Sequence, residues 1–230
     1  MDLKNISWID LTHDVHTNIP HWDGRCGFSH NNIKEYSDCS TEVKFCVQKF
    51  EMFAGIGTHM DAPAHCFANG KTIEQIPLEQ LIAPCVVIDV STKADQTYRV
   101  SPDDILAYEK KCGEIAASSF VAIHTGWDRF WQEPTKYRNN LTFPSIAQET
   151  AELLLTRNIV GLGIDTLSPD IPAHGFGVHK VLLGAGKYII ENMANTKQLP
   201  PTGAYILALP IKVAHATEAP MRLIALQSRT

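Results

Sequence analysis

The chain has 230 residues, which is enough for one large domain or two small ones. Hydrophobic residues make up 44% and charged residues 20% of the sequence, and the net charge is −5. This ordinary globular composition disfavours a nucleic acid partner, which needs clustered lysine and arginine, and the lack of a run of about 18 apolar residues disfavours a membrane partner.

Seven segments are predicted to form strands. In the first of them, Val43, Phe45 and Val47 occupy alternate positions, which is the period of a strand. The second is a β-branched run of the kind found in buried strands. In chain order, we expect the strands at 42–53, 84–90, 119–124, 160–165, 188–190, 204–209 and 221–226.

Helices are predicted between these strands. The clearest has Ser101 as its N-cap, Pro102 in its first turn and Gly113 at its end. Strands and helices alternate in the middle of the chain, while several late connections are too short to be crossovers. We therefore expect an α/β fold in which helices flank a mixed sheet. The helices are expected at 101–113, 145–157 and 178–183.

Cysteine usage indicates a reducing compartment. The six cysteines all lie in the first half of the chain, and none belongs to a C-x-x-C pair. The N-terminal segment does not resemble a signal peptide, so we expect reduced thiols in a cytoplasmic protein. We interpret Cys66 as a small buried hydrophobe rather than a reactive thiol. The cysteines are Cys26, Cys39, Cys46, Cys66, Cys85 and Cys112.

Chemistry-bearing side chains concentrate in 55–65, which reads G-I-G-T-H-M-D-A-P-A-H. If this segment is extended, His59 and Asp61 point to the same face, and an imidazole beside a carboxylate suits zinc, manganese or iron. Gly55 and Gly57 permit close backbone approach or unusual φ angles. A surface loop with ordinary hydrogen bonds is the alternative, but two glycines, a proline and a further histidine in so short a segment favour a site.

A second stretch, 164–191, carries five more side chains of the ligand type. His179 would lie on the predicted helix 178–183, and Glu191 would end the strand 188–190. Only the fold can bring these two residues together, and Glu191 alone could equally be a solvated edge residue. The five side chains are those of Asp165, Asp170, His174, His179 and Glu191.

These residues give the sequence a resemblance to the cyclase family of metal-dependent amidohydrolases, which includes kynurenine formamidase and isatin hydrolase. The family signature H-x-G-T-H-x-D-x-P-x-H matches 55–65 at every fixed position except the first, where Gly55 replaces histidine. Further landmarks extend the resemblance over essentially the whole chain. It implies one cyclase-type domain over 1–230, with a swivelling β/β/α-like fold. The landmarks include 9–12, 125–127, 163–168, 179–184 and 219–222.

The resemblance also implies the parts of a hydrolytic site. His65 matches the proton-transfer residue, and Asp61 would be the bridge if two metals bind. Because glycine offers no side-chain ligand, Gly55 should weaken or remove one of two metal positions. We expect Zn²⁺, with Mn²⁺ as the alternative. The implied metal ligands are His59, Asp61, His179 and Glu191.

The implied activity is attack of metal-activated water on an amide, either an aryl formamide such as N-formylkynurenine or a cyclic amide such as isatin. A lactone hydrolase and a non-catalytic metal- or small-molecule-binding protein of the same fold are the alternatives. Trp22 and Phe53 are the candidates for a slot that holds a planar substrate, ahead of Trp127 and Trp131. The resemblance further implies a homo-oligomer, either a dimer or a tetramer.

The remaining histidines are weaker candidates. His13 and His16 have a spacing that could bind metal, but a hydrogen-bonded loop is the better interpretation. His124 ends an apolar run, as a satisfied core histidine does. His174 lies in a loop rich in proline and glycine, and it could face the site and even replace the ligand missing at Gly55.

Overall fold

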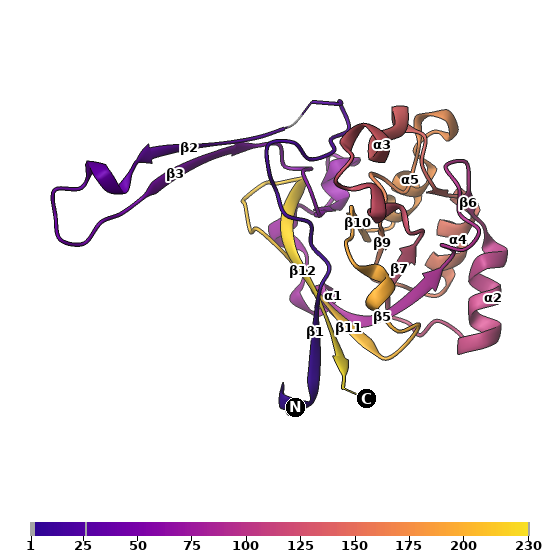
Figure 1. Cartoon of the computed structure of the whole chain (residues 1–230). Coiled ribbons are helices and arrows are strands. Elements are labelled where there is room, and N and C mark those ends of the chain that lie inside the picture. The colour runs from indigo at the N-terminus through magenta and orange to yellow at the C-terminus, as the bar shows by residue number, and fades with distance from the viewer. Residues whose placement is uncertain (1–2, 26, 230) are drawn as a thin grey trace.

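The computed structural model describes residues 3–25 and 27–229 (Figure 1). Cys26, one of the predicted reduced thiols, lies outside the described residues. An eight-stranded mixed sheet forms the centre of the molecule. Its strands are β1 (Ile6–Asp10), β4 (His59–Asp61), β5 (Ile82–Asp89), β7 (Phe120–His124), β9 (Gly161–Ile164), β10 (Tyr188–Glu191), β11 (Ala204–Pro210) and β12 (Glu218–Ser228).

The strand order is β1-β12-β11-β5-β7-β9-β10-β4, and β4 pairs in addition with β12. Strands β12 to β4 therefore close into a barrel-like ring, to which β1 is added along β12. Strands β5, β7, β9 and β10 are parallel to one another, whereas β11, β12, β1 and β4 pair in antiparallel fashion. The predicted mixed sheet is confirmed, and six of the seven predicted strands belong to it.

Alternation along the strands separates two apolar layers. On β7, Phe120 faces the interior of the ring and Val121 faces the opposite side. On β10, Ile190 and Ile189 divide in the same way. Because both faces are buried, these strands read as continuous apolar runs in the sequence.

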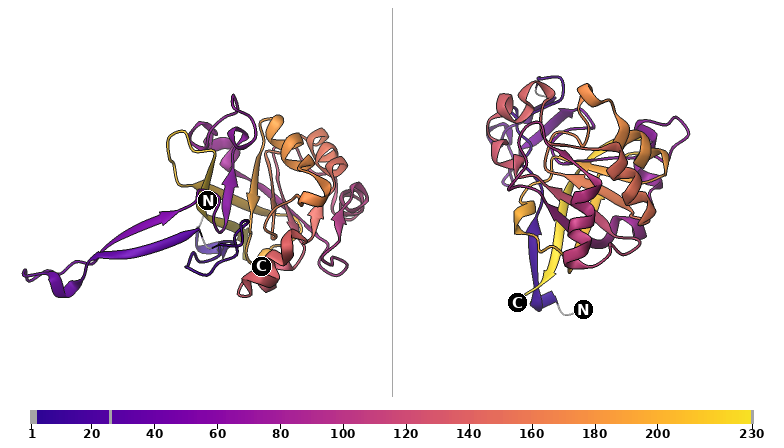
Figure 2. Two further views of the ribbon diagram at one scale, coloured as in Figure 1. Left: turned by 90° about the horizontal axis from the view of Figure 1, so that it is seen from above. Right: turned by 90° about the vertical axis from the view of Figure 1, so that its right-hand side faces the viewer.

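Helices cover the outer face of the parallel strands, as the right-hand view of Figure 2 shows. The predicted helix 101–113 is confirmed as α2, since the Ser101 and Asp104 side chains form its capping box. The predicted helix 145–157 begins late, because Ser145 and Ile146 form β8, which pairs with β6. The helices and the small sheet comprise α1 (Leu78–Leu81), α2 (Pro102–Cys112), α3 (Pro134–Arg138), α4 (Gln148–Thr156), α5 (Gly177–Gly184), β6 (Arg99–Val100) and β8 (Ser145–Ile146).

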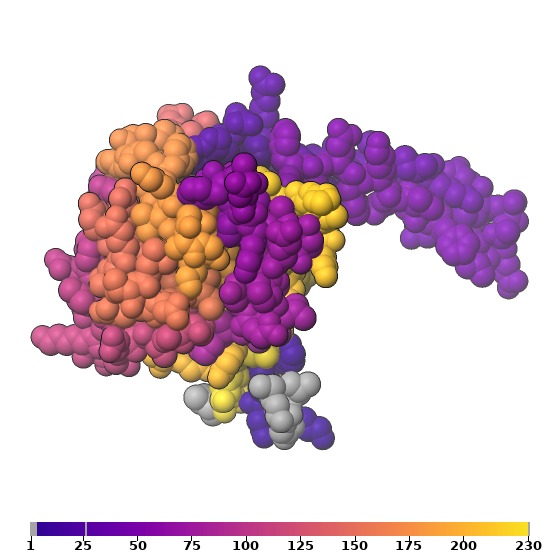
Figure 3. Space-filling view, turned by 180° about the vertical axis from the view of Figure 1, so that it is seen from behind, coloured from indigo at the N-terminus to yellow at the C-terminus, as the bar shows by residue number. Residues whose placement is uncertain are grey.

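A two-stranded arm projects far from the body of the molecule (Figures 1 and 3). It pairs β2 (Phe28–Lys34) with β3 (Val47–Met52) in antiparallel fashion. The strand predicted at 42–53 is therefore shorter than expected, and its partner went unpredicted because 28–34 carries consecutive polar residues. All six residues of β3 are exposed.

Short 3₁₀ turns complete the secondary structure, and two of them carry histidines discussed below. Within 3–25 and 27–229, no helix is both long enough and apolar enough to span a membrane. The turns are η1 (Leu3–Asn5), η2 (Tyr36–Asp38), η3 (Pro63–His65), η4 (Ile73–Gln75), η5 (Trp127–Phe130), η6 (Asn139–Leu141), η7 (Pro172–His174) and η8 (Thr196–Gln198).

Candidate active site

A cavity of about 490 Å³ lies beside the β10–β4–β12 part of the ring. Its size is that of a small-molecule site, and its lining combines aromatic side chains with titratable ones. The lining residues are Pro20, His21, Trp22, Asp23, Phe53, Ala54, Gly55, Gly57, His59, Asp61, His65, Cys66, Leu167, Ser168, Phe176, His179, Glu191, Asn192 and Glu218.

Strand register builds the polar floor of this cavity. His59 and Asp61 lie two positions apart on β4, so they point to one face, as predicted from the sequence. Glu191 of β10 lies opposite His59, and Glu218 of β12 lies opposite Asp61. Residues directly opposite in an antiparallel pair share a face. Four ligand-type side chains from three strands therefore face the cavity, while Met60 between them enters the apolar core.

The turn before β4 orients the imidazole of His59. Gly57 has a φ of +60°, a conformation that favours glycine, and its carbonyl accepts the Nδ1 contact of His59 at 2.9 Å. Asn192 Nδ2 donates to the same carbonyl, also at 2.9 Å. With Nδ1 held in this way, Nε2 of His59 is left for the cavity.

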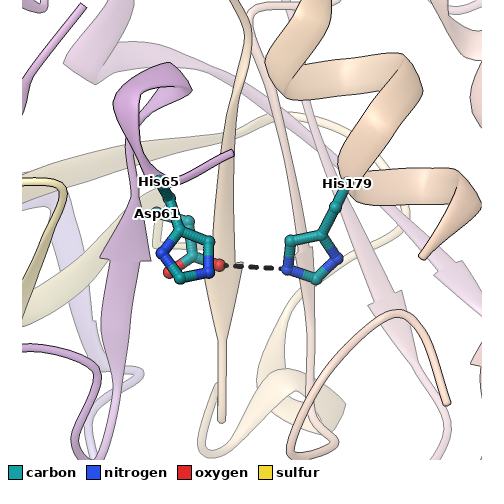
Figure 4. A group of neighbouring side chains, drawn as sticks. All are labelled: Asp61, His65 and His179. Carbon is teal, nitrogen blue, oxygen red and sulfur yellow. Dashed lines mark ion pairs between the residues drawn. The ribbon is translucent and has the colours of Figure 1, made fainter. Parts of the chain in front are cut away.

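Helix α5 supplies His179 from above the sheet. Nδ1 of His179 lies 2.7 Å from Oδ2 of Asp170, and the same carboxylate accepts the backbone N–H groups of Val178 and His179. Asp170 thus fixes both the first turn of the helix and the ring of His179. Nε2 of His179 consequently points toward Asp61 on the sheet, as Figure 4 shows.

The four side chains pair at distances that suit metal ligands, with each imidazole facing one oxygen of Asp61 and one of Glu191. Nε2 of His59 lies 3.4 Å from Asp61 Oδ1 and 3.4 Å from Glu191 Oε2, and Nε2 of His179 lies 3.5 Å from Asp61 Oδ2 and from Glu191 Oε1. Charge-assisted hydrogen bonds are shorter, about 2.7–2.9 Å. Donor atoms about 2.0–2.2 Å from a tetrahedral metal lie roughly 3.3–3.6 Å apart.

Burial makes this arrangement costly without a cation. His59, Asp61, His179 and Glu191 are each 7% exposed or less. Oδ1 of Asp61 is buried and has no hydrogen-bond partner among the described residues. Two imidazoles and two carboxylates are a donor set that zinc and manganese accept, so the residues present fit a divalent metal.

The pKa values reflect the same crowding. Burial would lower the pKa of His59, but Asp61, Glu191 and the Gly57 carbonyl outweigh it and raise that pKa to about 9. Burial works against the ionised form of Asp61 as well, yet the two histidines hold its pKa well below the usual range. Burial and the charge of Asp61 raise the pKa of Glu191 to about 7. Protons therefore occupy positions that a metal ion would take.

His65 lies beside this set, on the 3₁₀ turn that follows β4. Its ring faces that of His179 across the site, with centroids 6.0 Å apart (Figure 4). Its Nδ1 lies 3.4 Å from Oε2 of Glu218, and this pairing raises the pKa of His65. An exposed imidazole at the cavity is placed to exchange protons with a bound molecule.

Aromatic side chains form the opposite wall. The ring centroids of Trp22 and Phe176 lie 6.0 Å apart. The ring of Phe53 stacks on that of His21, with their centroids 5.1 Å apart. Both predicted substrate-contact residues, Trp22 and Phe53, thus line the cavity. The structure places the two other candidates, Trp127 and Trp131, in an apolar cluster outside the cavity lining.

The weaker histidine candidates lie outside the cavity lining. His174 is exposed, on a separate depression beside Phe176, so it does not take the place left at Gly55. The loop interpretation of His13 and His16 agrees with the structure, since His13 stacks on Trp131 and His16 Nδ1 accepts the backbone N–H of Asn18. His124 is a hydrogen-bonded core histidine, as expected. Its Nδ1 lies within hydrogen-bond distance of the Asp165 carboxylate and the Thr196 hydroxyl.

Two outcomes at this site differ from the sequence-based expectation. Cys66 is exposed at the cavity rather than buried, although partial burial still raises the pKa of its thiol. Glu218 was not a candidate, although it precedes the recognised segment 219–222 by one position. Only the pairing of β12 with β4 brings Glu218 next to Asp61, and no local pattern in the sequence predicts that pairing.

Comparison with known proteins shows the family to which this chain belongs. The Cyclase family model matches residues 9–171, which is more than half of the chain. The chain belongs to the cyclase family. Isatin hydrolase of Roseibium aggregatum is 32% identical over 186 residues, covering 74% of this chain and 70% of that protein. Kynurenine formamidase of Paracidovorax citrulli is 27% identical over 229 residues, covering 97% of this chain and 98% of that protein.

Solved structures of the cyclase family share the whole fold. Isatin hydrolase A from Ralstonia solanacearum superposes with a TM-score of 0.88 at 29% identity, covering 98% of this chain and 93% of that one. The expected cyclase-type α/β fold is therefore confirmed. Both kinds of relative carry the names of hydrolases.

Proposed function

We propose that this cyclase-family protein is a metal-dependent amidohydrolase. The observation that carries the proposal is the buried set of two imidazoles and two carboxylates, open on one side to a cavity with His65 at its edge. We propose as its metal ligands His59, Asp61, His179 and Glu191.

A divalent metal in this position supplies a water of lowered pKa and polarises the substrate carbonyl. His65 takes the proton of the attacking water, and it returns that proton to the amide nitrogen as the C–N bond breaks. Because Nδ1 of His65 pairs with Glu218, Nε2 is the nitrogen left for both transfers. His65 therefore ends each catalytic cycle in the protonation state in which it began.

The aromatic lining of the cavity supports a proposal for the substrate class. Trp22, Phe53 and Phe176 present aromatic faces to the cavity, which suits a planar aromatic amide. We propose an aryl formamide such as N-formylkynurenine or a cyclic amide such as isatin, in keeping with the names of the relatives. Hydrolysis of a lactone would use the same groups.

For the metal we propose Zn²⁺, because two imidazoles and two carboxylates make a common zinc donor set. Mn²⁺ is the alternative, since manganese accepts the same carboxylate oxygens.

Hydrolysis measured on a panel of aryl formamides, cyclic amides and lactones tests this function. We expect turnover that disappears after chelation and returns with Zn²⁺ or Mn²⁺. His65→Ala should keep the metal and lose roughly 10²–10⁴-fold in kcat. Full turnover by His65→Ala would refute the role of this residue. Bound metal without turnover on any substrate would favour the alternative, a non-catalytic binding protein.

We also propose that the chain forms a homo-oligomer, a dimer or a tetramer, through its arm. A two-stranded hairpin alone is marginally stable in water, and this arm exposes Val43, Phe45 and Phe50, each more than half accessible. A second copy of the chain would cover these side chains. Light scattering should show a smaller particle for Phe45→Lys but not for Leu106→Lys, a matched exposed position on α2. An unchanged mass for Phe45→Lys would refute assembly through the arm.

We propose the cytoplasm as its location. The five cysteines within the described residues are free thiols, a state that a reducing compartment preserves. Fractionation of the source cells with an antibody to this chain tests this location, and recovery outside the cytoplasm would contradict it.

A further inference from the structure

The space beside Gly55 is filled by a residue from another strand. A Cβ atom built on Gly55 would overlap Oε1 of Glu218 and would lie 3.2 Å from its carboxyl carbon. Nε2 of His59 lies 3.4 Å from the same point. Gly55 is not among the residues with positive φ, so its backbone would accept a side chain. The carboxylate of Glu218 is therefore what a side chain at this position would displace.

Glu218 also meets the requirements of a metal ligand. One donor atom each from His59, Asp61 and Glu218 lies within 4.8 Å of the others. Antiparallel register sets this closeness, because Glu218 lies directly opposite Asp61. The strand pairing thus delivers the carboxylate to the site without a flexible loop.

The unsatisfied atom of Asp61 points to the same place. Its Oδ2 faces His179 at 3.5 Å, whereas its Oδ1 faces His59 at 3.4 Å and is buried without a hydrogen bond from the described residues. The two oxygens of Asp61 therefore serve two neighbouring donor groups. One comprises His179 and Glu191, and the other comprises His59 and Glu218, with Oε2 of Glu191 also 3.4 Å from Nε2 of His59.

We propose that Glu218 is a metal ligand that replaces the imidazole missing at Gly55, so that the chain binds two divalent ions bridged by Asp61. This inference rests on the proposed metal-dependent function. It reverses the expectation that Gly55 costs the protein one of two metal positions. Oε1 of Glu218 serves the ion, while Oε2 remains paired with Nδ1 of His65. The same residue thus joins the second ion to the proton-transfer residue.

Zn²⁺ titration of metal-free protein, in competition with a chromophoric chelator, tests the proposal. Wild type should bind two ions. Glu218→Ala should weaken one of them by at least about 100-fold and leave the other unchanged, because loss of a mere outer partner of a ligand already costs roughly 10–100-fold. Glu218→Gln, which keeps the shape, should give an intermediate loss.

The decisive control is the exchange of positions. Gly55→His alone should not strengthen binding, because the imidazole and the Glu218 carboxylate compete for one space. Gly55→His combined with Glu218→Ala should restore the second ion. Circular dichroism and thermal unfolding of each variant exclude a folding defect as the cause.

The outcomes separate this inference from the proposed function. If wild type and Glu218→Ala bind equal numbers of ions with equal affinity, Glu218 is not a ligand, while the function stands. If the double variant binds no better than Glu218→Ala, the exchange of Gly55 and Glu218 is refuted. If wild type binds no Zn²⁺ at all, both proposals fail together.

Discussion

A substitution of Asp170 tests how the proposed metal ligand His179 is oriented, because the Asp170 carboxylate contacts His179 but is not itself a proposed ligand. Its Oδ2 lies 2.7 Å from Nδ1 of His179, which fixes the proton on Nδ1 and leaves Nε2 free. In Asp170→Asn an amide N–H can face Nδ1 instead. The imidazole then carries its proton on Nε2, where it opposes metal binding.

The expected size follows from these contacts. Loss of a carboxylate that is hydrogen-bonded to a metal-binding histidine typically costs about 10–100-fold in metal affinity, which is about 1.4–2.8 kcal/mol. The amide oxygen of the variant can still accept the backbone N–H of Val178, but its amide nitrogen cannot accept that of His179, so the metal-free variant should lose about 1 kcal/mol of stability as well.

Zn²⁺ competition and urea unfolding of the metal-free protein separate these two effects. Asp104→Asn is the matched control, because the buried carboxylate of Asp104 also accepts a backbone N–H at the start of a helix, that of Ser101 at α2, outside the cavity lining. It should lose stability and keep its metal affinity. Asp170→Asn with a wild-type dissociation constant for Zn²⁺ would refute the account of how His179 is oriented.

Three further predictions address the surroundings of the site. Burial lowers the pKa of His13 to about 4, so the unfolded chain, with its pKa near 6.5, binds the proton first. Wild type should therefore lose up to about 3 kcal/mol between pH 6.5 and 4, and urea unfolding of His13→Phe, which keeps the stack on Trp131, should show a smaller loss. Gly57→Ala should cost about 1–2 kcal/mol in thermal unfolding, since φ is +60° there, and it should weaken Zn²⁺ binding by tilting His59. Gly113→Ala, also at positive φ but in open space, should leave Zn²⁺ binding unchanged. Trp22→Ala should raise KM about 10-fold with little change in kcat, and an unchanged KM would remove Trp22 from the substrate slot.

Local chemistry made part of this protein predictable from its sequence. The capping box of α2 joins residues within four positions of each other, Ser101 and Asp104. The start of this helix could therefore be predicted without knowledge of tertiary contacts. The shared direction of His59 and Asp61 follows from strand alternation alone. The resemblance supplied the pairing of these residues with His179 and Glu191, which spacing alone could not give.

Long-range pairing accounts for what remained hidden. Glu218 reaches Asp61 only because β12 closes the ring against β4, a contact between segments far apart in the chain. His174 shows the converse, since a loop rich in proline and glycine near His179 carries it to a different depression. Strand β2 lacks apolar alternation because it lies in an exposed arm, where no core selects for it.

The central claim is that residues of β4, α5 and β10 together hold a divalent metal. Elemental analysis of gently purified protein, beside His59→Ala and Glu191→Ala, tests it most directly. We predict at least one zinc or manganese ion per wild-type chain, two if Glu218 is a ligand, and a loss of bound metal in both variants. A wild-type protein that holds no metal after exposure to Zn²⁺ and Mn²⁺, or variants that hold as much as wild type, would contradict the claim.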